Sequence, residues 1–209
     1  MTGDRGAFKK THSYGYYKGY DASKWVRYVT KVCVGIDKDW GLHLSDLIFH
    51  EYGIHGSVYW DRNEWRLESS SARLYRDLSN YYQQEWNTRS WRVTPALFTA
   101  AIKVRRAFVR GYFDADGYPY FGKARNHVYV QVNSVNYSGL LDAKRLLEGI
   151  GFHPGLYRRY KKRDVWELTI HRKQEVFRFS TEVTFSIRRK QEKLEKMLQD
   201  RWPNGLEQR

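Results

Sequence analysis

The sequence has little cysteine and no long apolar run, and each shortage excludes a class of protein. Its 209 residues include a single cysteine, Cys33, so one chain can form neither a disulfide framework nor a thiolate zinc site. No apolar stretch reaches the length of a membrane span, and no secretory signal peptide is recognisable. We therefore expect a cytoplasmic protein that has no membrane partner.

Acidic residues are also scarce relative to basic ones. Lysine and arginine total 37 against 23 aspartates and glutamates, which gives a net charge of +14. Such a surplus favours a polyanionic partner, most simply nucleic acid. Aromatic residues make up 17% of the chain, which predicts a folded core with stiff contact residues and argues against a disordered basic tail.

Residues 94–120 organise the rest of the chain. Thr94 is suited to cap a helix and Pro95 to occupy its first position, and apolar residues then recur with helical periodicity as far as Phe113. Gly117 is predicted to end this helix. Small residues spaced four apart lie on one face, where they would allow a second helix to approach closely: Ala107, Gly111 and Ala115.

An acid, Asp116, falls at the C-terminal end of this helix. The helix dipole disfavours a carboxylate there by about 0.3–1 kcal/mol, and a partner helix ending in the same way would add charge repulsion. A divalent cation removes both problems, because Mg²⁺ and Ca²⁺ prefer carboxylate and backbone oxygens. The alternative is that Asp114 to Gly117 form only a turn that ends the helix.

The two halves of the chain resemble one another. Residues 47–59 read like residues 146–157, and further similarities follow in the same order with similar spacing. This indicates two pseudo-twofold-related repeats, which we assign to residues 1–87 and 88–209. The expected fold is α+β, with repeats of the type αββαββα and antiparallel sheets, although the first helix of the first repeat is largely absent.

Periodicity places the elements of each repeat. In the second repeat we expect helices at 94–117, 137–150, 173–179 and 187–198, and strands at 118–123, 127–133, 155–160 and 165–170. In the first we expect strands at 25–36, 57–60 and 64–69, helices at 43–52 and 73–85, and a mobile basic loop or hairpin at 9–20. Alternation in the strand at 127–133 gives one apolar face, formed by Val128, Val130 and Val132, and one polar face that could read bases.

Residues 109–117 read VRGYFDADG and, with this order of elements in two copies, resemble the LAGLIDADG homing endonucleases, especially the single-chain archaeal type with two motifs. The resemblance covers nearly the whole chain. It implies that two motif helices pack at a pseudo-dyad and that the two sheets form a DNA-binding saddle. It also implies that the last acid of each motif binds metal. By position these acids are Asp4 and Asp116, with Gly3 and Ala115 as neighbouring metal ligands.

The first half departs from the family pattern. Residues 3–6 resemble the end of a motif with Arg5 substituted, and only three residues precede Asp4. The chain is therefore truncated relative to the natural product, or its first half has lost the motif helix, or a partner chain supplies the packing. We expect a monomer, with self-association if the first motif helix is missing.

The resemblance implies further site residues. Lys38 follows a strand where the family carries a polar residue that orients the attacking water, and Arg188 matches a phosphate-facing lysine. The alternatives are an ordinary turn lysine and a solvated start of a basic helix. Polar strand positions are predicted to contact DNA: Arg27, Lys31, Tyr129, Gln131, Asn133, Tyr157, Arg159, Glu167 and Thr169.

The implied function is site-specific cleavage of double-stranded DNA by an intron- or intein-encoded endonuclease. Asp4 and Asp116 would hold Mg²⁺, or Mn²⁺ in its place, while Lys38 and Arg188 stabilise charge during phosphodiester hydrolysis. The alternative is a binding protein on the same scaffold, either an RNA maturase or a sequence-specific DNA-binding protein. The missing helix and Arg5 favour this alternative, whereas the intact Asp116 argues against it.

Overall fold

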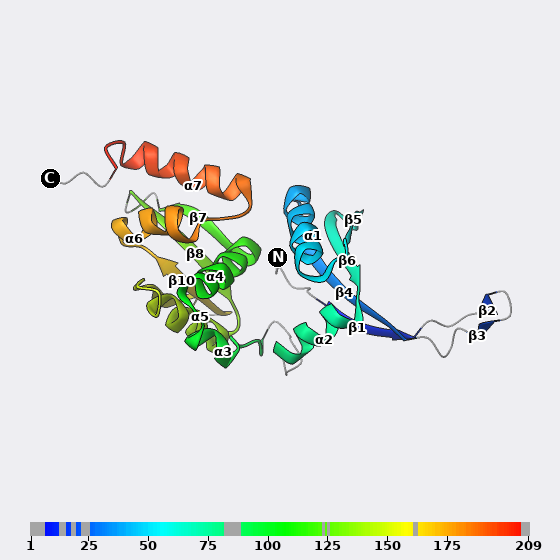
Figure 1. Ribbon diagram of the computed structural model, residues 1–209. Helices are drawn as coiled ribbons and strands as arrows, with labels where there is room; N and C mark the ends of the chain where they lie inside the picture. Colours follow the sequence, from blue (N-terminus) through cyan, green and yellow to red (C-terminus); the bar gives the residue numbers. More distant parts are fainter. Residues whose placement is uncertain are drawn as a thin grey trace. The chain divides into compact units, whose positions relative to one another are not determined.

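The computed structural model describes residues 7–12, 16–17, 20–21, 26–81, 89–122, 124, 126–160 and 163–205. The chain divides into two compact units, Met1–Gln83 and Gln84–Arg209, and each contains its own four-stranded antiparallel sheet (Figure 1). In the described ranges, every helix is too short or too polar to cross a membrane.

The sheet of unit 1 has the strand order β1-β4-β6-β5. Its strands are β1 (Ala7–His12), β4 (Val26–Gly35), β6 (Glu64–Ser70) and β5 (Ser57–Asp61). Helix α1 (Lys38–Tyr52) joins β4 to β5, and α2 (Ala72–Tyr81) follows β6. A separate pair is formed by β2 (Tyr16–Tyr17) and β3 (Tyr20–Asp21).

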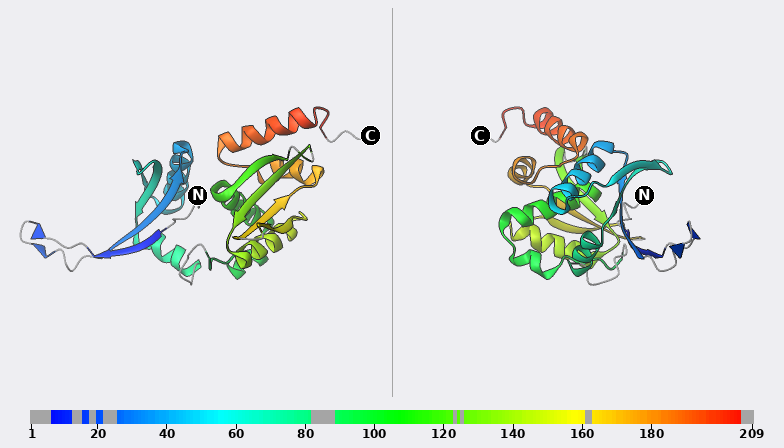
Figure 2. Two further views of the ribbon diagram at one scale, coloured as in Figure 1. Left: turned by 180° about the vertical axis from the view of Figure 1, so that it is seen from behind. Right: turned by 45° about the vertical axis from the view of Figure 1, so that its right-hand side comes forward.

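The sheet of unit 2 has the equivalent order, β7-β8-β10-β9. Its strands are β7 (Gly117–Gly122), β8 (His127–Ser134), β10 (Arg163–Ile170) and β9 (Gly155–Tyr160). Its helices are α3 (Pro95–Thr99), α4 (Ile102–Asp116), α5 (Tyr137–Glu148), α6 (Lys173–Arg178), the π-helix η3 (Phe179–Val183) and α7 (Arg188–Arg201). The helices lie on one face of the sheet (Figure 2).

The predicted repeat and the α+β fold are confirmed by this topology. In both units an edge strand is followed by a central strand, a helix, and a hairpin whose second strand returns to pair with the central strand. The helix inside each repeat is followed by a glycine in the left-handed region, Gly53 at φ 70° and Gly151 at φ 87°. A left-handed glycine therefore lies between the helix and the hairpin in both halves, directly after α1 and two residues beyond the C-cap Gly149 of α5.

Strict alternation along β8 builds the core of unit 2. Val128, Val130 and Val132 are each 0% exposed, and they lie in one cluster with Leu168 and Ile170 of β10. Burying an aliphatic side chain of this size contributes about 1.5–3 kcal/mol, so these five positions fix the strand register. The predicted apolar face is confirmed, and the opposite face is left to polar side chains.

The predicted continuous helix over residues 94–117 is wrong. Ala100 and Ala101 are extended, with ψ of 157° and 147°, so α3 ends at Thr99 and α4 begins at Ile102. Alanine is a strong helix former, and local propensity would have continued the helix. The break allows Leu97 and Phe98 of α3 to pack against the core of unit 2, and this burial outweighs the propensity.

Gly117 ends α4 for a reason different from the one predicted. Its φ of −82° and ψ of 160° are extended, so the chain passes from the helix directly into β7. A Cβ at this position would lie 2.6 Å from the ring and 2.8 Å from the carbonyl oxygen of Phe113. The glycine is therefore required by the close approach of Phe113.

Unit 1 differs from the prediction at two main places, and the bounds of other elements shift slightly. Residues 9–12 belong to β1 and pair with β4, and β2 pairs with β3, so among the described residues of 9–20 the hairpin alternative agrees with the structure and the mobile loop does not. Helix α1 begins at Lys38, five residues before the predicted start at His43, and includes buried Gly41, where an added Cβ would lie 3.1 Å from Val58 and 3.2 Å from Val34. Two further differences are small: β6 extends to Ser70, and α2 begins at Ala72.

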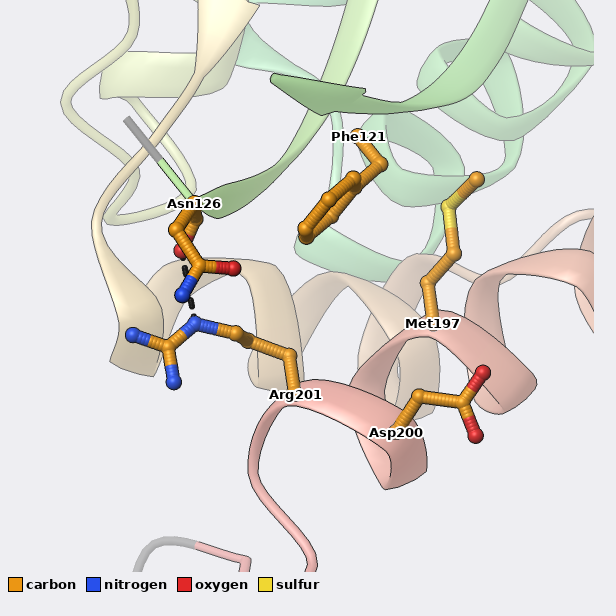
Figure 3. Close-up of a pocket in the computed structure, with 5 residues that line it drawn as sticks. All are labelled: Phe121, Asn126, Met197, Asp200 and Arg201. Carbon is orange, nitrogen blue, oxygen red and sulfur yellow. Dashed lines mark hydrogen bonds between the residues drawn. The ribbon is translucent and has the colours of Figure 1, made fainter. Parts of the chain in front are cut away.

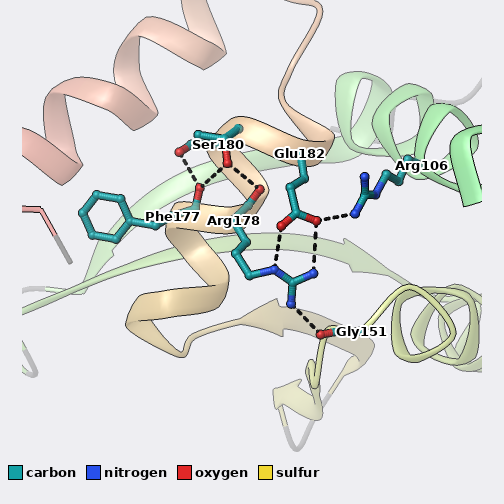
Figure 4. A network of polar contacts seen from close by, with 7 residues as sticks. Arg106, Gly151, Phe177, Arg178, Ser180 and Glu182 are labelled. Carbon is teal, nitrogen blue, oxygen red and sulfur yellow. Dashed lines mark hydrogen bonds and ion pairs between the residues drawn. The ribbon is translucent and has the colours of Figure 1, made fainter.

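A charged network joins three segments of unit 2 (Figure 4). Glu182 of η3 accepts bonds from Arg178 at 2.8 and 3.1 Å and is also paired with Arg106 of α4. Arg178 donates to the carbonyl oxygen of Gly151 at 2.8 Å. The hydrogen bond from Arg178, joined by the charges of Arg178 and Arg106, lowers the pKa of Glu182.

We predict that Glu182→Gln lowers the free energy of unfolding by about 1–2 kcal/mol near pH 7 because two arginines lose a charged partner. A lowered folded-state pKa means that the contribution is present above the ordinary glutamate value of about 4.3 and is lost as the pH falls through the folded value. Thermal unfolding between pH 7 and pH 3 measures both effects.

Glu192→Gln is the matched control, because Glu192 also forms an i,i+4 pair with an arginine but is 57% exposed. An exposed pair contributes about 0.3–0.5 kcal/mol. Equal losses in the two variants, or a Glu182→Gln difference that persists at pH 3, would contradict the assigned role.

Candidate functional site

Asp116 is the last residue of α4 and is half-buried. Its carboxylate therefore lies at the negative end of the helix, as the sequence predicted. One turn earlier, burial raises the pKa of Tyr112 well above its ordinary value, and the charge of Asp116 raises it further. The phenol of Tyr112 consequently stays neutral beside the carboxyl group of Asp116.

Asp114 and Lys190 join the end of α4 to the start of α7. The carboxylate of Asp114, whose residue is 2% exposed, accepts the backbone N–H of Ser186 at 2.8 Å and of Ile187 at 3.3 Å. Lys190 Nζ donates to the carbonyl oxygens of Asp114 at 2.6 Å, Gly117 at 2.7 Å and Phe113 at 3.3 Å. The two segments that carry Asp116 and Arg188 are thus held to one another.

The predicted catalytic residues are distributed over both units. Arg188 is the first residue of α7, and its exposed side chain is 2.6 Å from Glu192. Lys38 is the first residue of α1 in unit 1, and its Nζ lies 4.9 Å from the centroid of the Trp65 ring. Asp4 and its neighbour Gly3 lie outside the described residues.

The chemistry of this helix end suits a hard divalent cation. Asp116 provides a carboxylate, and Ala115 is exposed in the same turn. Within the described part of the chain, no three His, Cys, Asp or Glu side chains gather into a cluster. A complete metal site here requires a further ligand, and Asp4 is the residue predicted to supply it.

The polar face of the unit 2 sheet is organised around the hydroxyl of Tyr118. Gln131 Nε2 donates to it at 2.6 Å, Asn133 Nδ2 at 2.8 Å and Arg159 Nη1 at 3.1 Å. The side-chain oxygen of Asn133 is buried and has no partner among the described residues. We call these four residues the tyrosine hub, and they come from β7, β8 and β9.

The predicted DNA-contacting residues of unit 2 differ in accessibility. Gln131 and Thr169 are only 3% and 4% exposed, so they lie beneath the surface and support their neighbours. Arg159 and Tyr157 are exposed, and Arg159 lies 3.8 Å from Glu167. Tyr129 is half-buried on the same face, its ring centroid 6.2 Å from that of Tyr120.

In unit 1, the polar face of the sheet is already paired. Lys31 forms a 2.7 Å ion pair with Glu68, which also accepts a hydrogen bond from Tyr59 at 3.2 Å. The hydrogen bond to Glu68 raises the pKa of Lys31. Arg27 lies in β4, but its side chain is outside the described part of the structure.

A small pocket lies between β7 and α7 (Figure 3). Its lining is Phe121, Asn126, Met197, Asp200 and Arg201, and Arg201 donates to the carbonyl oxygen of Asn126 at 2.6 Å. None of the predicted site residues lines this pocket. It therefore adds nothing to the site at the end of α4.

The sequence reasoning missed Asp114, Lys190 and Tyr118 as site residues. In the sequence, Asp114 was recognisable only as part of the motif and Lys190 only as part of a basic stretch. Their contact could not be predicted, since it joins segments 76 residues apart in the chain. Tyr118 could have been predicted from the alternation of side chains along the hairpin, because the strand register pairs Tyr118 with Gln131. Counting residues along both strands outward from the turn would have placed Tyr118 and Gln131 on the polar face of the sheet.

Comparisons with known proteins find a family match within the second half of the chain. Residues 103–184 match the family model of a LAGLIDADG-like domain. Among curated proteins, the chain is 30% identical over 151 residues to an uncharacterized protein, MJ0398, of Methanocaldococcus jannaschii, of which the match covers 49%. It is 34% identical over 131 residues to a probable translation initiation factor IF-2 of Thermococcus kodakarensis, of which the match covers 11%.

Solved structures with a similar fold include homing endonucleases. A crystal structure of I-DmoI in complex with DNA and Ca has a TM-score of 0.60 at 15% identity, and the match covers 90% of both chains. A LAGLIDADG homing endonuclease, I-GzeII in complex with its DNA target, has a TM-score of 0.51 at 11% identity, with 88% of this chain and 84% of that chain covered. At these identities the likeness establishes the fold.

We predict that Gly117→Ala destabilises the protein by about 1–3 kcal/mol, because the added methyl group overlaps Phe113 and displaces the helix end that carries Asp116. Gly111→Ala is the matched control, since no atom of the described residues lies within 4 Å of a Cβ added there. In a helix interior this change stabilises by about 0.5–1 kcal/mol. Denaturant unfolding of both variants measures the difference, and equal effects would contradict the account of Gly117.

Proposed function

We propose that this chain, whose residues 103–184 match the model of a LAGLIDADG-like domain and whose fold resembles that of LAGLIDADG homing endonucleases, is an intron- or intein-encoded endonuclease. It hydrolyses phosphodiesters of double-stranded DNA at a specific site with a divalent cation, Mg²⁺ or Mn²⁺. The observation that carries this proposal is the position of Asp116, at the point where α4 enters a sheet whose open face is polar. Similar solved structures contain DNA together with Mn, Ca or Mg.

The proposed chemistry divides between the metal and the charged side chains. A bound divalent cation would neutralise charge on the phosphate and lower the pKa of a water molecule. Asp116 would hold the cation, with Asp4 and the backbone at Gly3 and Ala115 as the other proposed ligands. Arg188 and Lys38 would bind the phosphate oxygens and stabilise the charge that develops there.

DNA recognition is proposed for the polar faces of the sheets. Arg159 is exposed and carries the bidentate donors that suit guanine, while the amide of Asn133 suits adenine. The rest of the proposed set is Arg27, Lys31, Tyr129, Tyr157 and Glu167, with Gln131 and Thr169 in support from beneath. The net charge of +14 adds phosphate contacts that position the duplex and make binding weaken with salt.

We predict that Asp116→Asn slows Mg²⁺-dependent cleavage by about 10³-fold or more and leaves DNA binding intact, because it removes a metal-binding charge and keeps the side-chain volume. Single-turnover cleavage of a duplex selected from a random library measures the first effect. Binding of the same duplex in Ca²⁺ measures the second.

Asp200→Asn is the control for the charge change, because Asp200 is an exposed acid near the end of α7. This variant should cut DNA at the rate of the unaltered chain. If the unaltered chain binds a specific duplex tightly but cuts no DNA in Mg²⁺ or Mn²⁺, the nuclease proposal is wrong. The same scaffold would then act as a binding protein, and an intron splicing assay would test an RNA maturase role.

We predict that Tyr118→Phe relaxes base preference in the half-site that unit 2 reads, because Gln131 and Asn133 lose a shared acceptor. Loss of this acceptor should also lower stability by about 1–3 kcal/mol. Selection from a random duplex library measures the preference, and the salt dependence of binding should stay unchanged because no cationic side chain is removed.

Tyr120→Phe is the matched control, because Tyr120 lies two residues along the same strand, is exposed and is outside the tyrosine hub. Unchanged base preference in Tyr118→Phe, or an equal change in the control, would remove Tyr118 from the proposed reading surface.

A further inference from the structure

Helices α4 and α7 exchange caps at the place where they meet. Asp114, in the last turn of α4, accepts the N–H groups of Ser186 and Ile187, which immediately precede α7. Lys190, in the first turn of α7, donates to the carbonyl oxygens of Phe113 and Asp114 at the end of α4. A carboxylate therefore lies at the positive end of one helix and an ammonium group at the negative end of the other.

This exchange supplies partners for backbone groups at the two helix ends, among them the N–H of Ile187, the residue before α7, and the carbonyl oxygen of Asp114. The first N–H groups and the last carbonyl groups of a helix need partners from outside its own ladder. Asp114 and Lys190 supply such partners across the contact, and Lys190 also reaches Gly117 at the first residue of β7. The position of each helix end is consequently defined by a side chain from the other.

The segment that leads into α7 is held in a costly conformation. Thr184 has φ 64° and ψ 172°, a backbone region that residues other than glycine rarely adopt. Such strain persists only where the surroundings enforce it, and Gln191 does so by accepting the N–H of Phe185 at 2.9 Å and donating to the carbonyl oxygen of Ser180 at 3.0 Å. The rings of Phe113 and Phe185 both lie 5.2 Å from that of Phe179.

We infer that Asp114 and Lys190 form a positioning clasp for the proposed active site, holding Asp116 and Arg188 in one fixed arrangement. Each clasp residue lies two positions from the functional residue that it orients: Asp114 from Asp116, and Lys190 from Arg188. This inference rests on the proposed endonuclease function. In this role Asp114 and Lys190 act by positioning Asp116 and Arg188, and they do not themselves contact DNA or metal.

A simpler role for Lys190, in which it only neutralises nearby charge, leads to a different expected effect of its removal on cleavage. If its charge merely offset the carboxylates nearby, removing it would strengthen metal binding, because a cation near a metal site repels the metal. Less Mg²⁺ would then be needed, and the rate at saturating Mg²⁺ would not change. A clasp instead sets the rate at saturating metal, because misplacing a catalytic group by about 1 Å costs about a hundredfold.

The test compares Lys190→Met with Lys193→Met in the full chain, since Lys193 is an exposed lysine of the same helix. The probe is the duplex selected by the unaltered chain, cut in saturating MgCl₂ and bound in CaCl₂. We expect Lys190→Met to cut about ten- to a hundredfold more slowly, to bind the duplex within about threefold, and the control to match the unaltered chain. Asp114→Ala should behave as Lys190→Met does, whereas Asp114→Asn should retain most of the rate because its amide oxygen still accepts both N–H groups.

The outcomes separate the clasp from the proposed function. Cleavage by Lys190→Met at the control's rate in saturating Mg²⁺, with or without a lower Mg²⁺ requirement, overturns the clasp. Failure of the unaltered chain to cut overturns the endonuclease proposal, and hydrogen exchange then decides the clasp. Exchange at the amides of Ser186 and Ile187 should be at least about tenfold faster in Lys190→Met than in Lys193→Met, and equal exchange overturns it.

Discussion

The end of α4 concentrates negative charge in a small volume. Asp114 and Asp116 both lie in the last turn, where the carbonyl groups of the helix already point outward. The structure relieves this in part through Lys190 and through the N–H groups of Ser186 and Ile187, all of which belong to the α7 side of the contact. Asp114 is thereby bound within the protein, and we propose that Asp116 is the carboxylate that binds a divalent cation.

The two units repeat one topology with different degrees of burial. Among described residues of unit 1, the buried apolar side chains are Val29, Val34, Leu67 and Leu74, whereas the core of unit 2 is a large cluster that includes Phe113, Phe152 and Phe179. Unit 2 also holds the complete motif, with α4 running into β7. Its core therefore supports the helix end that the proposed chemistry requires.

The sequence predicted most of the elements and the repeat because both depend on local periodicity. Alternation at Val128, Val130 and Val132 is a property of neighbouring residues, and it translated directly into a buried face. The break at Ala100 and the contact of Lys190 with Asp114 depend on segments that meet only after folding, and no local pattern encodes them. Asp4, a proposed ligand of the proposed metal site, lies outside the described residues, so its placement stays a prediction.

The tyrosine hub has a consequence for altering the proposed DNA preference. One hydroxyl group is shared by side chains from β8 and β9, so the orientation of each depends on whether the others are present. Free-energy changes at coupled positions of this kind do not add. Redesign of this surface toward another sequence should therefore treat Tyr118, Gln131, Asn133 and Arg159 as one unit and exchange them together.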